Sequence, residues 1–374
     1  MTTKRLARRA FGPSRRIFRA LLLTIPLAPW TVAPAAAQAF DPQRADISVF
    51  IAELAQKHGF EPAPLTALLA QAESKPFILQ AIAKPAERTL TWDEYRSKFL
   101  IERRISRGVE VHDQRQAELE RAQAASGVPA DIILGIVGVE TFYGENIGKH
   151  RVIDALATLA FDYPPRQKFF RNELEQYLVM AREEGIDPLV PVGSYAGAMG
   201  LPQFMPSSFR SYAVDGDADG KRDLWNDWPD VFSSVGNYLK VHGWKAGEPV
   251  LAAADASNAN LAGLDDKLAL TETVGSLRAR SVKFETGLPS SAPAMLVALK
   301  VAAGTEYRVG FTNFYAITRY NRSHMYASAV NDLADAIAAT RAGLPLPAAS
   351  GPPATAPLAP SEPVSGWSTT TSGT

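Results

Sequence analysis

Apolar residues recur every three or four positions through most of residues 45–240, a spacing that places them on one face of a helix. The pattern predicts apolar helical stripes over 47–54 and 65–69, one long helix over 95–119, and helices over 131–143, 169–184 and 232–242. Gly144, Gly185 and Gly243 follow the last three of these helices, and glycine readily adopts the left-handed conformation that ends a helix. The first part of the chain is therefore expected to be a helical body.

The pattern changes after about residue 248. Short runs of strand-forming residues follow at 281–285, 295–301 and 307–309. Ala303-Gly304 is the expected hairpin turn between the last two runs, and a final helix is predicted over 326–340. The sequence therefore predicts an α+β protein that is mainly α, with a small antiparallel β region inserted late, at about 248–311.

Both ends of the chain have the composition of segments outside a folded core. Residues 1–39 hold seven basic residues and no acid, then an apolar run, and end in Ala37-Gln38-Ala39, which is typical of a secretory signal peptide. An uncleaved membrane anchor is the alternative, although three prolines interrupt the apolar run. Residues 344–374 contain seven prolines and one charge, which predicts a disordered tail and leaves 40–343 as the folded region.

The charge balance changes once this leader is set aside. The whole chain carries 39 basic and 39 acidic residues, but the part after residue 39 carries 32 basic and 39 acidic residues, a net charge of −7. A mildly acidic exported protein is a poor candidate for nucleic-acid binding. The chain has no cysteine, so disulfides, a thiol nucleophile, cysteine-ligated zinc and a lipid anchor on an N-terminal cysteine are not expected. The glycine patterns of nucleotide-binding loops are missing as well, so no organic cofactor is expected.

Glu140 is a candidate general acid because of its position. It lies four residues after Ile136 and seven after Ile133, on the apolar stripe of its predicted helix. No basic residue stands three or four positions away, and burial without a cation raises the pKa of a carboxyl group. A raised pKa suits a general acid that works near neutral pH. A structural glutamate held by a distant arginine fits the same pattern, so both interpretations stay open.

The segment 193–209 combines small residues with neutral polar and aromatic ones. Ser194, Tyr195 and Gln203 offer neutral hydrogen-bonding groups, and the glycines of the segment allow another chain to approach its backbone closely. This combination suits a sugar polymer better than a phosphate. A tightly packed corner between helices is the alternative.

An acidic loop resembles the first half of an EF-hand. Acidic residues stand at its positions one, three and five, namely Asp215, Asp217 and Asp219. Asn226 stands at position twelve, where a glutamate is expected, so a later carboxylate, Asp227 or Asp230, would complete the site. The loop predicts a calcium site, with a solvated acidic turn as the alternative.

Four longer motifs point to a known family. They stand at 139–144 (VETFYG), 155–164 (ALATLAFDYP), 193–209 (GSYAGAMGLPQFMPSSF) and 320–323 (YNRS). With them, the chain resembles the membrane-bound lytic murein transglycosylase B family from about residue 50 to about residue 340. This resemblance implies a lysozyme-like helical core and an enzyme that cleaves peptidoglycan.

The resemblance also implies roles for single residues. Glu140 would be the single catalytic acid and base. The saccharide groove would be lined or walled by nine residues, namely Ser194, Gln203, Phe204, Tyr238, Asn321, Tyr143, Tyr195, Met199 and Tyr320. The calcium loop would use Asp215, Asp217, Asp219, Lys221 and Asp230. Peptidoglycan glycan strands are the expected partner, with cell-wall synthesis or remodelling enzymes as further candidates.

The expected reaction is cleavage of the β-1,4 bond between N-acetylmuramic acid (MurNAc) and N-acetylglucosamine (GlcNAc) without water, which leaves a 1,6-anhydromuramoyl end. A hydrolytic muramidase and a non-catalytic peptidoglycan-binding protein are the alternatives. The leader predicts export to the periplasm by the twin-arginine or the general secretory route, and its lack of cysteine predicts a form without a lipid anchor.

Overall fold

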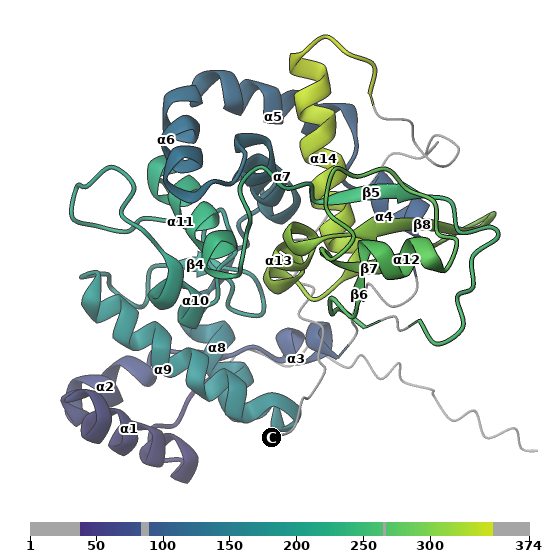
Figure 1. The fold of residues 1–374 in the computed structure, drawn as a ribbon. Helices are drawn as coiled ribbons and strands as arrows, with labels where there is room; N and C mark the ends of the chain where they lie inside the picture. The colour runs from purple at the N-terminus through teal and green to yellow at the C-terminus, as the bar shows by residue number, and fades with distance from the viewer. Residues whose placement is uncertain (1–37, 84–89, 265–266, 347–374) are drawn as a thin grey trace, which may run out of the picture. The chain divides into compact units, whose positions relative to one another are not determined.

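The computed structural model describes residues 38–83, 90–264 and 267–346 of the chain (Figure 1). The signal peptide predicted for 1–39 lies outside the described residues except for its last two positions. The tail predicted for 344–374 lies outside them except for its first three positions. Both assignments therefore stay predictions.

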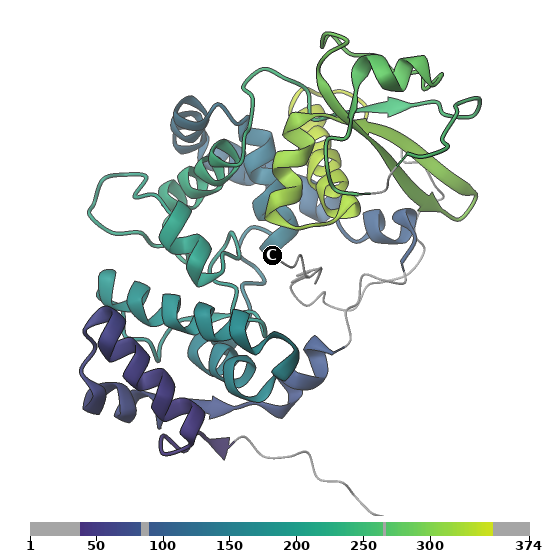
Figure 2. The same ribbon diagram turned by 60° about the horizontal axis from the view of Figure 1, so that its bottom comes forward.

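One group of helices comes from the first 190 residues and packs around α8 and α9 (Figure 2). It comprises α1 (Ala45–His58), α2 (Pro62–Leu69), α3 (Pro76–Ile82), α8 (Val152–Asp162), the 3-10 turn η2 (Pro164–Arg166) and α9 (Gln167–Glu183). The apolar stripe predicted over 47–54 is buried, and the rings of Phe50 and Phe161 meet edge to face with centroids 5.6 Å apart. A two-residue antiparallel ladder joins β1 (Gln38–Ala39) to β2 (Glu73–Ser74) beside these helices.

The long helix predicted over 95–119 is wrong, because the structure has three helices there. They are α4 (Trp92–Ser97), α5 (Glu102–Gln114) and α6 (Gln116–Ser126). The chain leaves helical geometry after α4, where Phe99 turns inward to 2% exposure and the guanidinium of Arg104 donates to the carbonyl of Lys98. It leaves helical geometry again at Arg115, which has φ −125° and ψ 22°. No glycine or proline stands at 98–101 or at 115, so the sequence pattern marks neither break.

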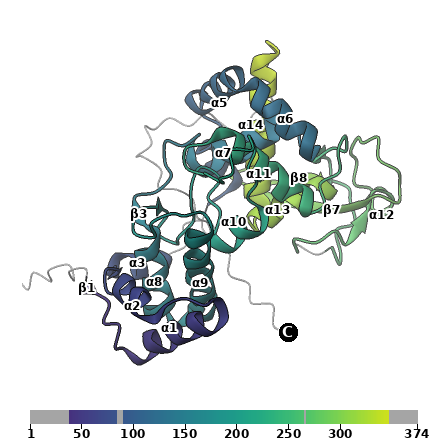
Figure 3. The ribbon, with the colours of Figure 1, turned by 90° about the vertical axis from the view of Figure 1, so that its left-hand side faces the viewer.

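Helix α7 (Ala130–Thr141) is covered on all sides, since every residue from position 132 to 141 is buried. It packs against α14 (His324–Arg341), as Figures 1 and 3 both show. Gly135 makes this approach possible, because a Cβ there would lie 2.7 Å from the carbonyl oxygen of Val330. The helix predicted over 131–143 ends two residues early, at Thr141.

The helical body is completed by α10 (Pro206–Tyr212), α11 (Trp228–Val241), α13 (Thr312–Tyr320) and a two-residue ladder between β3 (His150–Arg151) and β4 (Val192–Gly193). The helices predicted over 169–184, 232–242 and 326–340 are confirmed as α9, α11 and α14, with ends shifted by up to four residues. The predicted class, α+β and mainly α, is confirmed as well.

The late β region is a four-stranded antiparallel sheet in the order β5-β8-β7-β6. It contains β5 (Leu251–Ala254), β6 (Glu272–Thr273), β7 (Pro293–Val301) and β8 (Gly304–Gly310), with the short helix α12 (Val274–Ala279) after β6. β7 and β8 form the predicted hairpin, and the pairing of Val301 with Gly304 leaves a two-residue turn between them. The strand predicted over 281–285 is wrong, since this run forms only an isolated bridge between Lys283 and Asp255.

Within the described residues, no single helix is long and apolar enough to cross a membrane. Helices α6 and α7 pass that test only when they are taken together, and they are bent by 108° where they meet.

A buried cluster of charges joins α4, α14 and the sheet. Asp332 of α14 accepts from Arg96 Nε at 2.8 Å and from both terminal nitrogens of Arg308, at 2.6 and 3.0 Å. All three side chains are buried, and the guanidinium of Arg308 also stacks over Trp92. Because charges this far from water must be paired, the cluster fixes where α14 lies.

We expect Asp332→Asn to lower the free energy of unfolding by about 3–5 kcal/mol, because buried Arg96 loses the carboxylate that its Nε bonds and buried Arg308 is left with Glu306 as its carboxylate partner. Urea unfolding measures the loss. Glu110→Gln is the control, since Glu110 forms an exposed pair with Arg107 and its loss should cost less than about 1 kcal/mol. Equal stability of the two variants would contradict the assignment.

Candidate active site

Glu140 lies one residue before the end of α7 and is 9% exposed. The hydroxyl of Tyr326 donates a hydrogen bond to its Oε1 at 2.6 Å. Tyr326 stands in the first turn of α14, where the hydroxyl of Ser323 accepts from the Tyr326 backbone N–H and fixes the start of the helix. A phenol on another helix thus donates to the carboxyl group of Glu140.

A row of aromatic rings begins at Tyr326. Tyr320 lies 6.4 Å from Tyr326 between ring centroids, and Tyr238 lies 4.7 Å from Tyr320. The ring centroid of Phe204 lies 5.8 Å from that of Tyr320 and 5.6 Å from that of Tyr238. Tyr320 and Tyr238 remain 8% exposed, so the row keeps some ring surface at the edge of the protein.

The hydroxyl groups of Tyr320 and Tyr238 are hydrogen-bonded to backbone carbonyls. The hydroxyl of Tyr320 donates to the carbonyl of Pro202, and that of Tyr238 to the carbonyl of Arg319, both at 2.6 Å. Burial, and after it the nearby carboxylate of Glu140, raise the pKa of Tyr320 well above its usual value. Burial raises the pKa of Tyr238 in the same direction. These tyrosines are therefore neutral and present ring surface.

The segment 193–209 folds into a tight loop before α10, as its small residues allow. The hydroxyl of Ser194 accepts from the backbone N–H groups of Ala196 and Ala198, at 3.3 and 3.0 Å. Met199 and Phe204 exchange two backbone hydrogen bonds across the loop, at 2.8 and 3.1 Å. The loop is held by its own backbone, which places its side chains beside the aromatic row.

Two amide side chains carry unsatisfied acceptors. Gln203, in a left-handed conformation with φ 53°, donates through Nε2 to the carbonyls of Gly200 and Ile147 at 2.8 and 3.1 Å. The Oε1 atom of Gln203 and the Oδ1 atom of Asn321 are buried and have no hydrogen-bond partner among the described residues. A buried acceptor without a partner is costly, so both oxygens are suited to accept from a ligand hydroxyl or amide.

The structure brings most of the predicted groove residues together around Glu140, namely Gln203, Phe204, Tyr238, Tyr320 and Asn321. Tyr195 is partly exposed at the same loop. Ser194 and Met199 have no exposed surface, so contact with a bound saccharide requires their neighbours to move.

The prediction that Tyr143 forms a wall of the groove is wrong. Its side chain is 3% exposed and lies in the core between α5, α7 and α14, where its hydroxyl oxygen fills the space above Gly108 and Gly138. The tyrosine that follows α7 therefore packs inward, between helices.

Sequence reasoning missed Tyr326 as a site residue. It lies 186 positions from Glu140, and its place in an apolar helical pattern predicts only a core residue. No local signal connects it to the carboxyl group that it binds.

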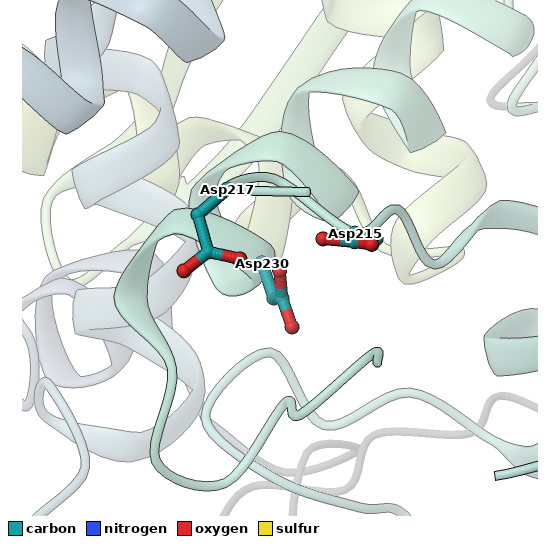
Figure 4. Close-up of side chains that lie close together, drawn as sticks. All are labelled: Asp215, Asp217 and Asp230. Atoms are coloured by element: carbon teal, nitrogen blue, oxygen red, sulfur yellow. The ribbon is translucent and has the colours of Figure 1, made fainter. Parts of the chain in front are cut away.

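The acidic loop forms a separate cluster between α10 and α11. Carboxylate oxygens of Asp215, Asp217 and Asp230 lie within 4.8 Å of one another (Figure 4). Asp219 is outside this group, and its carboxylate accepts from the Lys221 backbone N–H at 2.8 Å. Of the two later carboxylates considered, Asp230, in the first turn of α11, lies in this group and Asp227 does not.

Asp230 is the buried member of the cluster, at 1% exposure. It accepts from the backbone N–H groups of Gly216 and Asp223, both at 2.6 Å, and so ties the loop to α11. Burial, the dominant cause, raises its pKa to about 6. Three carboxylates this close repel one another unless a cation lies between them, and oxygen donors of this kind are those that Ca²⁺ prefers.

Comparison with known proteins supports these observations. Residues 42–335 match the family model described as the transglycosylase SLT domain. The chain is 42% identical over 301 residues to membrane-bound lytic murein transglycosylase B of Escherichia coli (strain K12). The alignment covers 78% of this chain and 82% of the relative.

Two solved structures are similar in fold. The soluble lytic transglycosylase SltB1 of Pseudomonas aeruginosa is 47% identical, covers 79% of this chain and 99% of its own, and has a TM-score of 0.75. The E. coli lytic transglycosylase Slt35 in complex with calcium is 40% identical, covers 82% of this chain and 97% of its own, and has a TM-score of 0.74.

We expect Ser194→Ala to lower the free energy of unfolding by about 1–3 kcal/mol, because two buried backbone N–H groups lose their acceptor. Thermal unfolding measures the loss. Ser208→Ala is the control, since the described residues give its side chain no hydrogen bond. A Ser194 variant as stable as this control would show that the hydroxyl does not hold the loop.

Proposed function

This chain belongs to the transglycosylase SLT-domain family and is a peptidoglycan-cleaving lytic transglycosylase, and we propose that Glu140 is its single catalytic acid and base. The proposed reaction cleaves the MurNAc–GlcNAc β-1,4 bond without water and leaves a 1,6-anhydromuramoyl end. One observation carries the proposal: the carboxyl group of Glu140 is buried, is held by the phenol of Tyr326, and stands beside a row of aromatic rings.

The proposed mechanism begins with proton donation. In this proposal Glu140 begins in its protonated form, with the hydroxyl of Tyr326 donating to its Oε1 at 2.6 Å. Glu140 passes this proton to the oxygen of the bond between MurNAc and GlcNAc. The 2-acetamido group of the substrate stabilises the oxocarbenium-like centre that forms, a role that Asn321 or Ser194 assists by orienting that group.

The second step closes the anhydro ring. Glu140, now ionised, takes the proton of the muramoyl C6 hydroxyl as that oxygen attacks C1. Glycosidases that use protein groups alone need a second carboxylate beside the bond. The next three acids after Glu140 along the chain each pair with an arginine, namely Glu145 with Arg103, Asp154 with Arg151, and Asp162 with Arg44. Their engagement supports a mechanism in which the substrate supplies the nucleophile.

Recognition of the glycan follows from the neutral character of the site. The rings of Tyr238 and Tyr320 offer stacking surface, and the free oxygens of Gln203 and Asn321 accept from sugar hydroxyl or amide groups. Peptidoglycan is anionic and the chain after residue 39 carries a net charge of −7, so attraction over long range does not drive binding. We place the enzyme in the periplasm, after removal of the predicted signal peptide, with peptidoglycan strands as its partner.

We also propose that the cluster of Asp215, Asp217 and Asp230 holds a structural Ca²⁺. The donors fit the ion, because all three are carboxylate oxygens within 4.8 Å of one another. Bound there, the ion would clamp the acidic loop to the first turn of α11, the helix that carries Tyr238. Its effect on the active site would be to hold α11, with no part in the reaction itself.

Glu140→Gln tests the catalytic assignment. It keeps the shape of the side chain but removes the transferable proton, so we expect cleavage of purified sacculi to fall by at least 1,000-fold, on the order expected for loss of an essential acid. The melting temperature should change little. Glu145→Gln is the matched control, because Glu145 is exposed and paired with Arg103, and it should keep normal activity.

Mass spectrometry of the products completes this test. Muramoyl ends without the mass of water support the anhydro reaction, whereas ends with the mass of an added water would show a muramidase. Near-normal turnover by Glu140→Gln would overturn the assignment. Binding without cleavage by the unmutated protein would show a binding protein.

The calcium proposal predicts a stability change that depends on the ion. At a free Ca²⁺ concentration of 100 times Kd, binding adds about 2.7 kcal/mol to the free energy of unfolding, so a chelator should lower the melting temperature by several degrees. Asp217→Asn should abolish this response, while Asp113→Asn, on an exposed side chain, should keep it. The proposal fails if the chelator has no effect on the unmutated protein.

A further inference from the structure

The chain turns sharply directly after the helix that carries Glu140. Phe142, Tyr143 and Gly144 have φ values of 53°, 57° and 91°, so three consecutive residues adopt the left-handed conformation. Glycine tolerates this conformation, whereas a phenylalanine and a tyrosine are strained in it. Such strain persists only where the surrounding structure enforces it, and it gathers at functional sites.

Tyr143 fills a slot between two helices and thereby enforces the turn. Its side chain is 3% exposed. A Cβ on Gly108 of α5 would lie 2.5 Å from the hydroxyl oxygen of Tyr143, and a Cβ on Gly138 of α7 would lie 2.6 Å from the same atom. Real contacts are not this short, so the ring enters only because both positions lack a side chain.

The slot uses the volume of the Tyr143 side chain, its terminal oxygen included, and not a hydrogen bond from the hydroxyl group. Tyr143 Oη is buried and has no hydrogen-bond partner among the described residues. Burial raises the pKa of this phenol, which is therefore neutral. A buried tyrosine that is needed for its hydroxyl normally gives that hydroxyl a partner.

The turn also connects the catalytic helix to the loop of the groove. Thr141, the residue after Glu140, donates through its hydroxyl to the carbonyl of Leu201 at 2.9 Å. The same hydroxyl accepts from the Gly144 backbone N–H at 3.1 Å. The position of the carboxyl group relative to the groove thus depends on the geometry of the turn.

We propose that Tyr143 is a positioning residue whose ring, wedged between Gly108 and Gly138, holds the left-handed turn that fixes the carboxyl group of Glu140 beside the saccharide groove. This inference rests on the proposed function, in which Glu140 is the acid and base. A displacement of a catalytic group by about 1 Å lowers turnover roughly 100-fold. Saccharide binding depends on other residues and is unaffected.

Gly108→Ala tests the wedge directly. The added methyl group meets the hydroxyl oxygen of Tyr143 and, at 2.6 Å, the Cδ1 atom of Ile337. Alanine favours a helix more than glycine does, so α5 itself is not weakened. We expect kcat on purified murein to fall about 10- to 100-fold, with KM changed less than about twofold, together with a lower melting temperature.

Second substitutions separate the wedge from ordinary packing. In Gly108→Ala/Tyr143→Phe the oxygen that the methyl group meets is gone, so kcat and the melting temperature should return close to those of Tyr143→Phe. In Gly108→Ala/Ile337→Val only the other contact is relieved, so the defects should remain. Tyr143→Phe alone should keep normal kcat and a melting temperature at or above that of the unmutated protein.

The opposite pattern would overturn the wedge. Rescue by Ile337→Val and not by Tyr143→Phe would mean that the methyl group acts through core packing. A tenfold loss of kcat in Tyr143→Phe alone would mean that the hydroxyl acts directly. The unmutated protein and Glu140→Gln are measured alongside, and absence of cleavage by the unmutated protein would overturn the proposed function. The melting temperatures of the double variants then still decide for or against the wedge, because that comparison does not depend on catalysis.

Discussion

The burial of one carboxyl group at the end of an apolar helix is the constraint on which the rest of the structure depends. Taking a carboxyl group out of water is costly unless it is hydrogen-bonded, and Tyr326 supplies that bond to Glu140 at 2.6 Å. The donor stands on another helix, so α14 must keep its position against α7. Asp332, six residues after Tyr326 on α14, bonds to Arg96 and Arg308 and so fixes that helix to α4 and the sheet.

The strain beside Glu140 follows from the same demand for a fixed geometry. Phe142, Tyr143 and Gln203 all have positive φ, and each such residue costs about 1–3 kcal/mol. This is a large share of the roughly 5–15 kcal/mol by which a domain is stable. Two of the three are aromatic and almost fully buried, and the burial of such a side chain contributes about 1.5–3 kcal/mol. The free energy gained by burying the rings of Phe142 and Tyr143 therefore offsets the conformational strain at these two positions.

The sequence predicts the local features of the site and not its long-range contacts. Glu140 is visible because a carboxylate on an apolar stripe can be seen within two turns of one helix, whereas Tyr326 is 186 residues away and has only the pattern of a core residue. Tyr143 was placed in the groove by the family resemblance, whereas its ring lies in the core at the glycine slot between α5 and α7, which exists only in three dimensions. The helix predicted over 95–119 is divided at 98–101 and at Arg115, where no glycine or proline marks a break in the sequence.

The charges along the chain after Glu140 agree with the proposal of a single acid. Glu145, Asp154 and Asp162 each pair with an arginine. In the proposed reaction, the positive centre that forms on the sugar would then be stabilised by the substrate, whose acetamido group lies next to the reacting carbon. Such a reaction would require the sugar to be held firmly beside the acid. The aromatic rings and the amide oxygens of Gln203 and Asn321 are the groups proposed to hold it.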